Sequence, residues 1–167
     1  ALANNSATTS VTVNSRPTTT TLFSTGNIST TIPDPGTVEI PLAVGSSGNI
    51  LDIRPRLRIN HTFDADLDLF LLSPTGIVIP LSTDNGGDGD NYGSGATTCA
   101  GTPTTFADSA ATPITAGVPP FAGTFRPESP LEAIAGSSMT GTWKLRIRDD
   151  FGSDGGTIFC FQLGITR

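Results

Sequence analysis

Residues 60–91 read NHTFDADLDLFLLSPTGIVIPLSTDNGGDGDN, and this stretch decides the fold. Two apolar runs flank the sequence S-P-T-G at positions 73–76, where proline suits the second position of a tight turn and glycine closes it. The stretch therefore predicts a β-hairpin over residues 66–83. If the turn pairs its own first and last residues, Asp66 faces Thr83 and aspartates gather at one end of the hairpin.

These aspartates predict a cation site. Carboxylates crowded at one end of a hairpin repel each other unless water or a cation screens them, and oxygen ligands on a glycine-rich loop suit Ca2+. Aspartate also ends turns for conformational reasons alone, and that is the alternative. The favoured ligands are Asp66, Asp84, Asp88, Asp90 and Asp108, with Asp66 and Asp108 expected to share one ion; the weaker ones are Asp64, Asp68, Asp149, Asp150 and Asp154.

The rest of the chain predicts an all-β fold, a sandwich or a barrel. The 167 residues suit one domain, and its 19 glycines and 13 prolines divide short apolar runs without a long helical period. Residues 50–63 and 142–148 alternate apolar and polar side chains, so each predicts a strand with one buried face. Residues 157–166 are almost continuously apolar and predict a central strand. Pro55 predicts a bulge or bend in its strand.

The basic residues predict either a docking face or an ordinary solvated face. The net charge of −6 argues against a nucleic-acid partner. Most of the cations lie on the polar faces of the two alternating strands, so one sheet carries a basic stripe if those strands pair. Such a stripe suits an acidic partner domain. The residues are Arg54, Arg56, Arg58, Lys144, Arg146 and Arg148.

The two cysteines, Cys99 and Cys160, predict a disulfide that closes a loop of about 60 residues; two buried free thiols are the alternative. An even cysteine count in a Thr-, Gly- and Asp-rich chain suits an oxidising compartment. No apolar run approaches the roughly 18 residues that a membrane-spanning helix needs. Without a signal peptide, the chain reads as a piece of a longer secreted or cell-surface protein.

Residues 1–22 and 23–167 predict two different parts. The first part is polar and Thr-rich, which is typical of an inter-domain linker. Residues 3–13 resemble the last strand of the Ig-like repeats of bacterial surface proteins, so the linker is expected to carry a remnant of such a repeat. The second part holds the folded domain.

Seven motifs from residue 23 onward resemble the P domain (P/Homo B domain) of kexin- and furin-like proprotein convertases and bacterial subtilases. They are I-P-D at 32–34, I-N-H-T at 59–62, D-L-D-L-F-L-L-S-P-T-G at 66–76, F-A-D-S-A at 106–110, P-F-A-G-T-F-R-P-E-S-P-L at 120–131, G-T-W-K-L-R-I-R-D at 141–149 and G-G-T-I-F-C-F-Q-L-G-I at 155–165. The resemblance implies a jelly-roll β-sandwich of about eight strands. It also implies a non-catalytic module beside a Ser-His-Asp protease, supporting that domain's folding and its calcium or pH response.

Two other functions are weighed against this one. The run G-S-S-M at 136–139 is similar to a subtilase nucleophile motif, but Thr140 follows and no proline closes it. His61, the one histidine, lies on the apolar face of its strand, so no catalytic triad is expected. A calcium-dependent adhesion or carbohydrate-binding module of a bacterial surface protein is the alternative. It needs exposed aromatic side chains, and Tyr92 is the candidate. The isolated fragment is expected to be a monomer.

Overall fold

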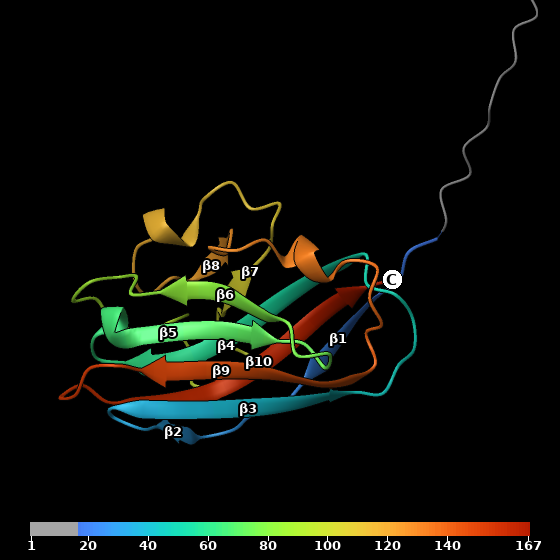
Figure 1. Ribbon diagram of the computed structural model, residues 1–167. Coiled ribbons are helices and arrows are strands. Elements are labelled where there is room, and N and C mark those ends of the chain that lie inside the picture. Colours follow the sequence, from blue (N-terminus) through green and yellow to red (C-terminus); the bar gives the residue numbers. More distant parts are fainter. Residues whose placement is uncertain (1–16) are drawn as a thin grey trace, which may run out of the picture.

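The computed structural model describes residues 17–167, which form two β-sheets packed face to face (Figure 1). The first sheet has the order β1-β10-β4-β7-β8, with β2 also paired to β10. Its strands are β1 (Thr20–Ser24), β2 (Thr30–Ile32), β4 (Asp52–His61), β7 (Thr104–Phe106), β8 (Gly123–Phe125) and β10 (Gly156–Thr166). The second has the order β3-β9-β5-β6, with strands β3 (Gly36–Val44), β5 (Leu67–Leu72), β6 (Val78–Thr83) and β9 (Gly141–Asp149).

The predicted sandwich is confirmed, with ten strands in the described residues instead of about eight. Three short 3-10 helices join them: η1 (Asp64–Asp66), η2 (Ile114–Ala116) and η3 (Leu131–Ile134). Alternate residues of both sheets point inward, as the period of two predicts. Trp143 is fully buried and its indole nitrogen donates to the carbonyl of Met139, so it belongs to the core as expected.

The closing strand β10 is central, as predicted, but its faces change partway along. Ile158 pairs with Ile59 while Cys160 pairs with Arg58, so the register shifts at Phe159. The extra residue is a β-bulge, which re-aims the side chains that follow it. Ile158 and Phe161 therefore both point into the core and Phe159 is partly exposed, an arrangement that strict alternation along the strand would not give.

The predicted bulge at Pro55 is wrong. Pro55 lies inside β4 opposite Leu163 without any shift of register. On its other side, β7 pairs only with Arg56 and Leu57. At Pro55 the strand β4 therefore has no partner on the β7 side among residues 17–167. Proline is tolerated there because no neighbouring strand of this described part needs a hydrogen bond from its missing N–H.

The hairpin β5–β6 exists, but its register differs from the prediction. The backbone amide of Ser73 donates to Ile77, not to Gly76, because Gly76 adopts a positive φ of 89° and lengthens the loop. A second irregularity follows between Leu69 and Phe70. As a result Thr83 lies opposite Asp68 instead of Asp66. The aspartates still gather at this end, with different partners.

A disulfide between Cys99 and Cys160 confirms the expected pairing. It fastens the long polar segment 84–103 to the outer face of β10. The same segment is also attached to the core by Tyr92, which is fully buried and bonded through its hydroxyl to Ser82. The two attachments order a segment that contains very little regular structure.

The two ends of the described chain lie side by side. Thr19 and Arg167 exchange both backbone hydrogen bonds at 3.0 Å, and Thr20 pairs with Thr166. Strand β1 thus begins within the segment assigned from sequence to the linker, because its backbone completes the edge of β10. Residues 1–16, with the Ig-like segment, lie outside the described residues. Within residues 17–167, no helix is long and apolar enough to cross a membrane.

Candidate functional site

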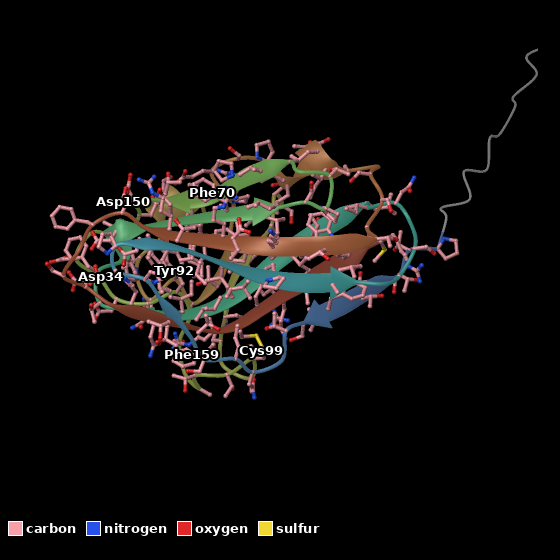
Figure 2. All side chains as sticks on the ribbon, turned by 60° about the horizontal axis from the view of Figure 1, so that its bottom comes forward. Asp34, Phe70, Tyr92, Cys99, Asp150 and Phe159 are labelled. Carbon is pink, nitrogen blue, oxygen red and sulfur yellow. A yellow bond between two sulfur atoms is a disulfide. The ribbon has the colours of Figure 1, made fainter. Side chains whose placement is uncertain are left out.

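One end of the sandwich collects most of the predicted aspartates. It lies where β4 ends, η1 and β5 begin, and the turn between β9 and β10 closes; Figure 2 shows Asp34 and Asp150 there. The backbone termini lie at the other end of β10 (Figure 1). We call this region the acidic end and define it by Asp34, Asp64, Asp66, Asp68, Asp84, Asp90, Asp149, Asp150 and Asp154.

Asp64 is the most unusual residue of the acidic end. Its side chain is fully buried, and neither carboxylate oxygen has a hydrogen-bond partner in the described residues. The glycine-rich loop 84–91 closes over it: the amide of Asp64 donates to Gly89 at 2.8 Å and that of Ala65 to Gly87 at 3.2 Å. Burial, with a smaller contribution from Asp90, raises the pKa of Asp64 to about 8, against the opposing effect of the Asn91 amide. A buried carboxylate without partners costs free energy unless a proton or a cation compensates it.

The remaining aspartates of the hairpin and loop divide into buried and exposed groups. Asp68 is mostly buried and accepts from Arg148 at 3.3 Å; burial, then Asp84 and Asp150, raises its pKa while Arg148 lowers it. Asp84, Asp88 and Asp90 are exposed on the loop. The structure thus brings Asp64 close to Asp90, and Asp68 close to Asp84, as two neighbouring groups.

Asp108 is far from these groups. Its two carboxylate oxygens accept the backbone amides of Leu131 (2.9 Å) and Glu132 (2.8 Å), so it caps η3. It lines a cavity with Asp52 at the start of β4, whereas Asp66 follows the end of that strand. Most of a ten-residue strand, about 25 Å, separates the two positions. The structure therefore does not bring Asp66 and Asp108 together.

His61 and Asp149 form a buried pair at the same end. Both side chains are inaccessible to solvent, and Nε2 of His61 lies 3.1 Å from Asp149. Nδ1 of His61 lies 2.8 Å from the carbonyl oxygen of Phe63. Both ring nitrogens are thus engaged within the interior, which suits a structural histidine and leaves neither free to act as a base.

The six basic residues do not form one stripe. Strands β4 and β9 lie in different sheets, so the two groups of cations occupy opposite faces of the sandwich. Arg58 is buried and donates to the carbonyl of Ile59 at 2.7 Å. Most of the others have acidic partners: Arg54 with Asp52, Lys144 and Arg146 with Glu39, and Arg148 with Asp68 and Asp150. Arg56 completes the set on β4. The condition for a single basic docking face, pairing of the two strands, is not met.

Glu39 supports a pH-dependent contribution to stability. Hydrogen bonds from Lys144 and Arg146 hold its pKa below the ordinary value. A carboxylate with a lowered pKa stabilises the fold above the ordinary pKa, and the effect is lost as the pH falls through the lowered value. We expect Glu39→Gln to reduce the free energy of unfolding by at most about 1 kcal/mol at pH 7, because the group is partly exposed. Urea unfolding at pH 7 and at pH 2.5 checks this: the difference between variant and wild type should be smaller at the lower pH, and an equal difference at both would contradict it.

The structure also adds residues that the sequence analysis missed. Glu128, from the connection before η3, accepts from both the amide and the hydroxyl of Thr83 and from Asn85, which fastens loop 84–91 to β6. Phe151, at the tip of the β9–β10 turn, is 68% exposed. An isolated phenylalanine within the acidic sequence D-D-F-G-S was the available signal for it. No local signal marks Glu128, because its partners are more than 40 positions away.

Tyr92 corrects another expectation. It was the exposed aromatic candidate for a carbohydrate site, but it is fully buried and stacks on Phe121 with ring centroids 4.8 Å apart. Figure 2 shows Tyr92 in the interior, between the sheets. Gly86, Gly87 and Gly93, on the segment that carries Tyr92, adopt positive φ angles, which glycine accepts without steric cost.

Within residues 17–167, no three His, Cys, Asp or Glu side chains converge in a geometry that holds a metal ion. A Ca2+ ion at Asp64 would therefore take backbone carbonyls of loop 84–91 as further ligands, which this ion accepts readily. The fully buried, unpartnered carboxylate and the surrounding polar backbone fit such an ion. The same fit does not extend to Asp108, whose oxygens already accept two amides.

Fold and site together define a β-sandwich module with one disulfide and a loop-rich acidic end. The model of the proprotein convertase P-domain matches residues 50–165, most of the chain, and the chain belongs to this family. The family is one of accessory domains of proteases. No curated protein sequence matches the chain.

Three solved structures share the fold. The chain is similar to a serine protease of Aeromonas sobria, at 14% identity and a TM-score of 0.58, covering 93% of this chain and 28% of that one. It is also similar to a chain in the complex of Aeromonas sobria serine protease (ASP) with the chaperone ORF2, at 14% identity and a TM-score of 0.57, covering 90% and 27%. FLHE gives 13% identity and a TM-score of 0.51, covering 90% and 97%. This chain thus spans little more than a quarter of each Aeromonas chain.

Proposed function

We propose that this chain is a non-catalytic accessory domain of a secreted or cell-surface protein, which packs on a neighbouring domain and stabilises it. The neighbour proposed is a subtilisin-like serine endopeptidase. The observation that supports this most directly is membership of the P-domain family over residues 50–165. The likeness to about a quarter of a serine protease chain supports attachment to a protease. The disulfide supports an oxidising compartment.

The full-length parent protein provides the test of this role. Deleting residues 20–167 should lower both the yield and the melting temperature of the neighbouring domain, since the domain would lose a surface that it packs against. The control is to supply residues 20–167 as a separate chain together with the deletion variant. Partial recovery of yield and melting temperature would show that contact with this domain is what the variant lacks. Full yield and unchanged melting after deletion would contradict the proposal.

The second part of the proposal is that Ca2+ stabilises the acidic end, with Asp64 as the central ligand. Asp64 is buried without a partner, and Asp90 lies close enough to raise its pKa. Backbone oxygens of loop 84–91 complete the ligands. Asp66 and Asp154 are left out of this ion's environment because they line a separate cavity. Asp149 and Asp150 are left out because they lie near Asp66 and not near Asp64.

Calcium should raise the melting temperature of the 167-residue chain. An ion that binds only the folded state at a free concentration of about 100 Kd adds about 2.7 kcal/mol. For a domain of this size, that corresponds to roughly 5–10 °C. Thermal unfolding in CaCl2, in MgCl2 and in EDTA measures it. Equal melting temperatures in CaCl2 and EDTA would exclude the calcium site and leave the accessory role untouched.

Adhesion remains as the second candidate function, and a glycan array tests it. Burial of Tyr92 removes the aromatic side chain on which that hypothesis depended. Saturable binding to a defined glycan would nevertheless favour adhesion over the accessory role.

A further inference from the structure

A cavity of about 320 Å3 at the acidic end combines aromatic and acidic walls. It is lined by Phe63, Asp66, Phe151 and Asp154. Phe63 and Asp66 flank η1, and the other two belong to the turn between β9 and β10. Two segments that are far apart in the sequence therefore build it together.

The turn that carries Phe151 is held by several hydrogen bonds. The amide of Ser153 donates to Asp34, the amide of Phe151 to Asp149, and the amide of Asp150 to the carbonyl of Asp66. The hydroxyl of Thr62 donates to Asp154 at 2.8 Å. A well-fastened turn that holds a phenylalanine 68% exposed leaves a large apolar ring in water. An aromatic ring in that position, beside a cavity, is available for contact with another molecule.

The carboxylates of the cavity lack a compensating charge. Asp66 is more than nine-tenths buried, and its Oδ2 has no hydrogen-bond partner in the described residues. Neither Asp66 nor Asp154 forms an ion pair within the described residues, while His61 contacts Asp149 and Arg148 contacts Asp68 and Asp150. The cavity thus favours a positive group from outside this segment of chain.

The lining indicates an organic cation and not a bare metal ion. Ca2+ prefers oxygen ligands on all sides, whereas two of the four lining residues are phenylalanines. A guanidinium group can stack on an aromatic ring and donate two parallel hydrogen bonds to a carboxylate, which an ammonium cannot do. A ring beside two carboxylates therefore favours arginine over lysine.

We propose that the Phe63–Phe151 cavity binds an arginine side chain presented by a neighbouring protein domain. This inference rests on the proposed accessory role, since it names the chemistry of the surface that the domain packs against. Phe151 stacks on the guanidinium, and the carboxylates of Asp66 and Asp154 accept its N–H groups. The acidic end then serves both as the cation-stabilised end of the sandwich and as a docking site.

Amide chemical shifts of the full chain test the cavity directly. Acetyl-arginine amide should shift the amides of residues 63–66 and 150–155 saturably, with a Kd in the millimolar range. Acetyl-citrulline amide, which has nearly the same shape without the charge, should bind at least tenfold more weakly. Acetyl-lysine amide should fall between them. Titrations in EDTA and in CaCl2 should give the same Kd, because the calcium ion is proposed at Asp64.

Two exposed or partly exposed positions supply variants that leave the core intact. Phe151→Leu should weaken binding of acetyl-arginine amide about two- to fivefold, the size of one exposed cation–π contact. Asp154→Asn should weaken it by a similar factor. Glu132→Gln, an exposed acid near Asp108, is the matched control and should change nothing.

Three results would overturn the inference. The first is equal binding of the arginine and citrulline probes, and the second is chemical-shift changes confined to amides outside residues 63–66 and 150–155. The third is displacement of the arginine probe by CaCl2, with the amides of the same residues shifting when the metal alone is added. Calcium-dependent melting is scored separately. If calcium raises the melting temperature but arginine and citrulline bind equally, the arginine proposal is rejected and the calcium proposal stands. Loss of the accessory role would appear in the domain deletion and not in either titration.

Discussion

Replacing Asp64 with asparagine is expected to raise the melting temperature of the calcium-free chain and to abolish its response to calcium. The wild-type carboxylate is fully buried and unpartnered. Because burial raises the pKa of Asp64 to about 8, the calcium-free chain must take up a proton on folding at neutral pH, and this lowers its stability. Asparagine keeps the shape and has no proton to take up, so it should stabilise the metal-free protein by about 1 kcal/mol or more. The variant then lacks the central anionic ligand, so the stabilisation of about 2.7 kcal/mol from calcium is lost as well.

The opposite signs make this experiment decisive. Thermal unfolding of wild type and Asp64→Asn should be measured in EDTA and in CaCl2, and the order of the two melting temperatures should reverse between the buffers. Asp88→Asn, on the same loop but exposed, is the matched control and should change neither value appreciably. A variant that is less stable than wild type in EDTA would show that the carboxylate makes favourable contacts of its own, and would contradict the prediction.

Removing the disulfide is the second large effect. The Cys99→Ser, Cys160→Ser double variant opens a loop of sequence separation 61. In the chain-entropy model, this lowers the free energy of unfolding by about 4 kcal/mol, because the unfolded chain regains the freedom that the cross-link removed. For a domain of this size the melting temperature should fall by roughly 8–16 °C. Thermal unfolding of wild type in buffer with and without reductant measures the same quantity independently.

The segment 93–103 should respond most strongly to loss of the disulfide. Its exposed threonines and glycines give it little apolar area to bury, and the cystine and the Cys99 amide, which donates to Asn27, fasten it to the sheet. Hydrogen exchange of these amides should accelerate more than that of loop 84–91, which Tyr92 and Glu128 hold separately. Uniform acceleration in both segments would show that the two attachments are not independent.

The strands were predictable where one face of each is buried. Alternation identified β4 and β9 and placed Trp143 in the core, because a period of two leaves few other arrangements. The sequence could not reveal the bulge at Phe159, since a bulge depends on which residue of the partner strand lies opposite. The same limit applies to the hairpin, where one extra loop residue and a second register shift between Leu69 and Phe70 together moved Thr83 from Asp66 to Asp68.

The candidate site was predictable in composition and not in geometry. Counting aspartates indicated the acidic end, yet the favoured pair Asp66 and Asp108 lies at opposite ends of β4. Asp64, ranked among the weaker candidates, is the one with both carboxylate oxygens buried and unpartnered within the described residues. Burial depends on how loop 84–91 closes over η1, which is a long-range event. The prediction of a single basic stripe failed for a related reason: two similar strands need not be neighbours, and β4 and β9 lie in different sheets.

The paired backbones of Thr19 and Arg167 have a consequence for the architecture of any host protein. The backbones of Thr19 and Arg167 are separated by the spacing of adjacent strands, about 5 Å. This domain could therefore be inserted into a surface loop of another protein without moving the two ends of that loop apart. Since the acidic end lies at the opposite end of β10 from Thr19 and Arg167, it would point away from the host protein. Its reach would extend to surfaces well beyond the point of insertion.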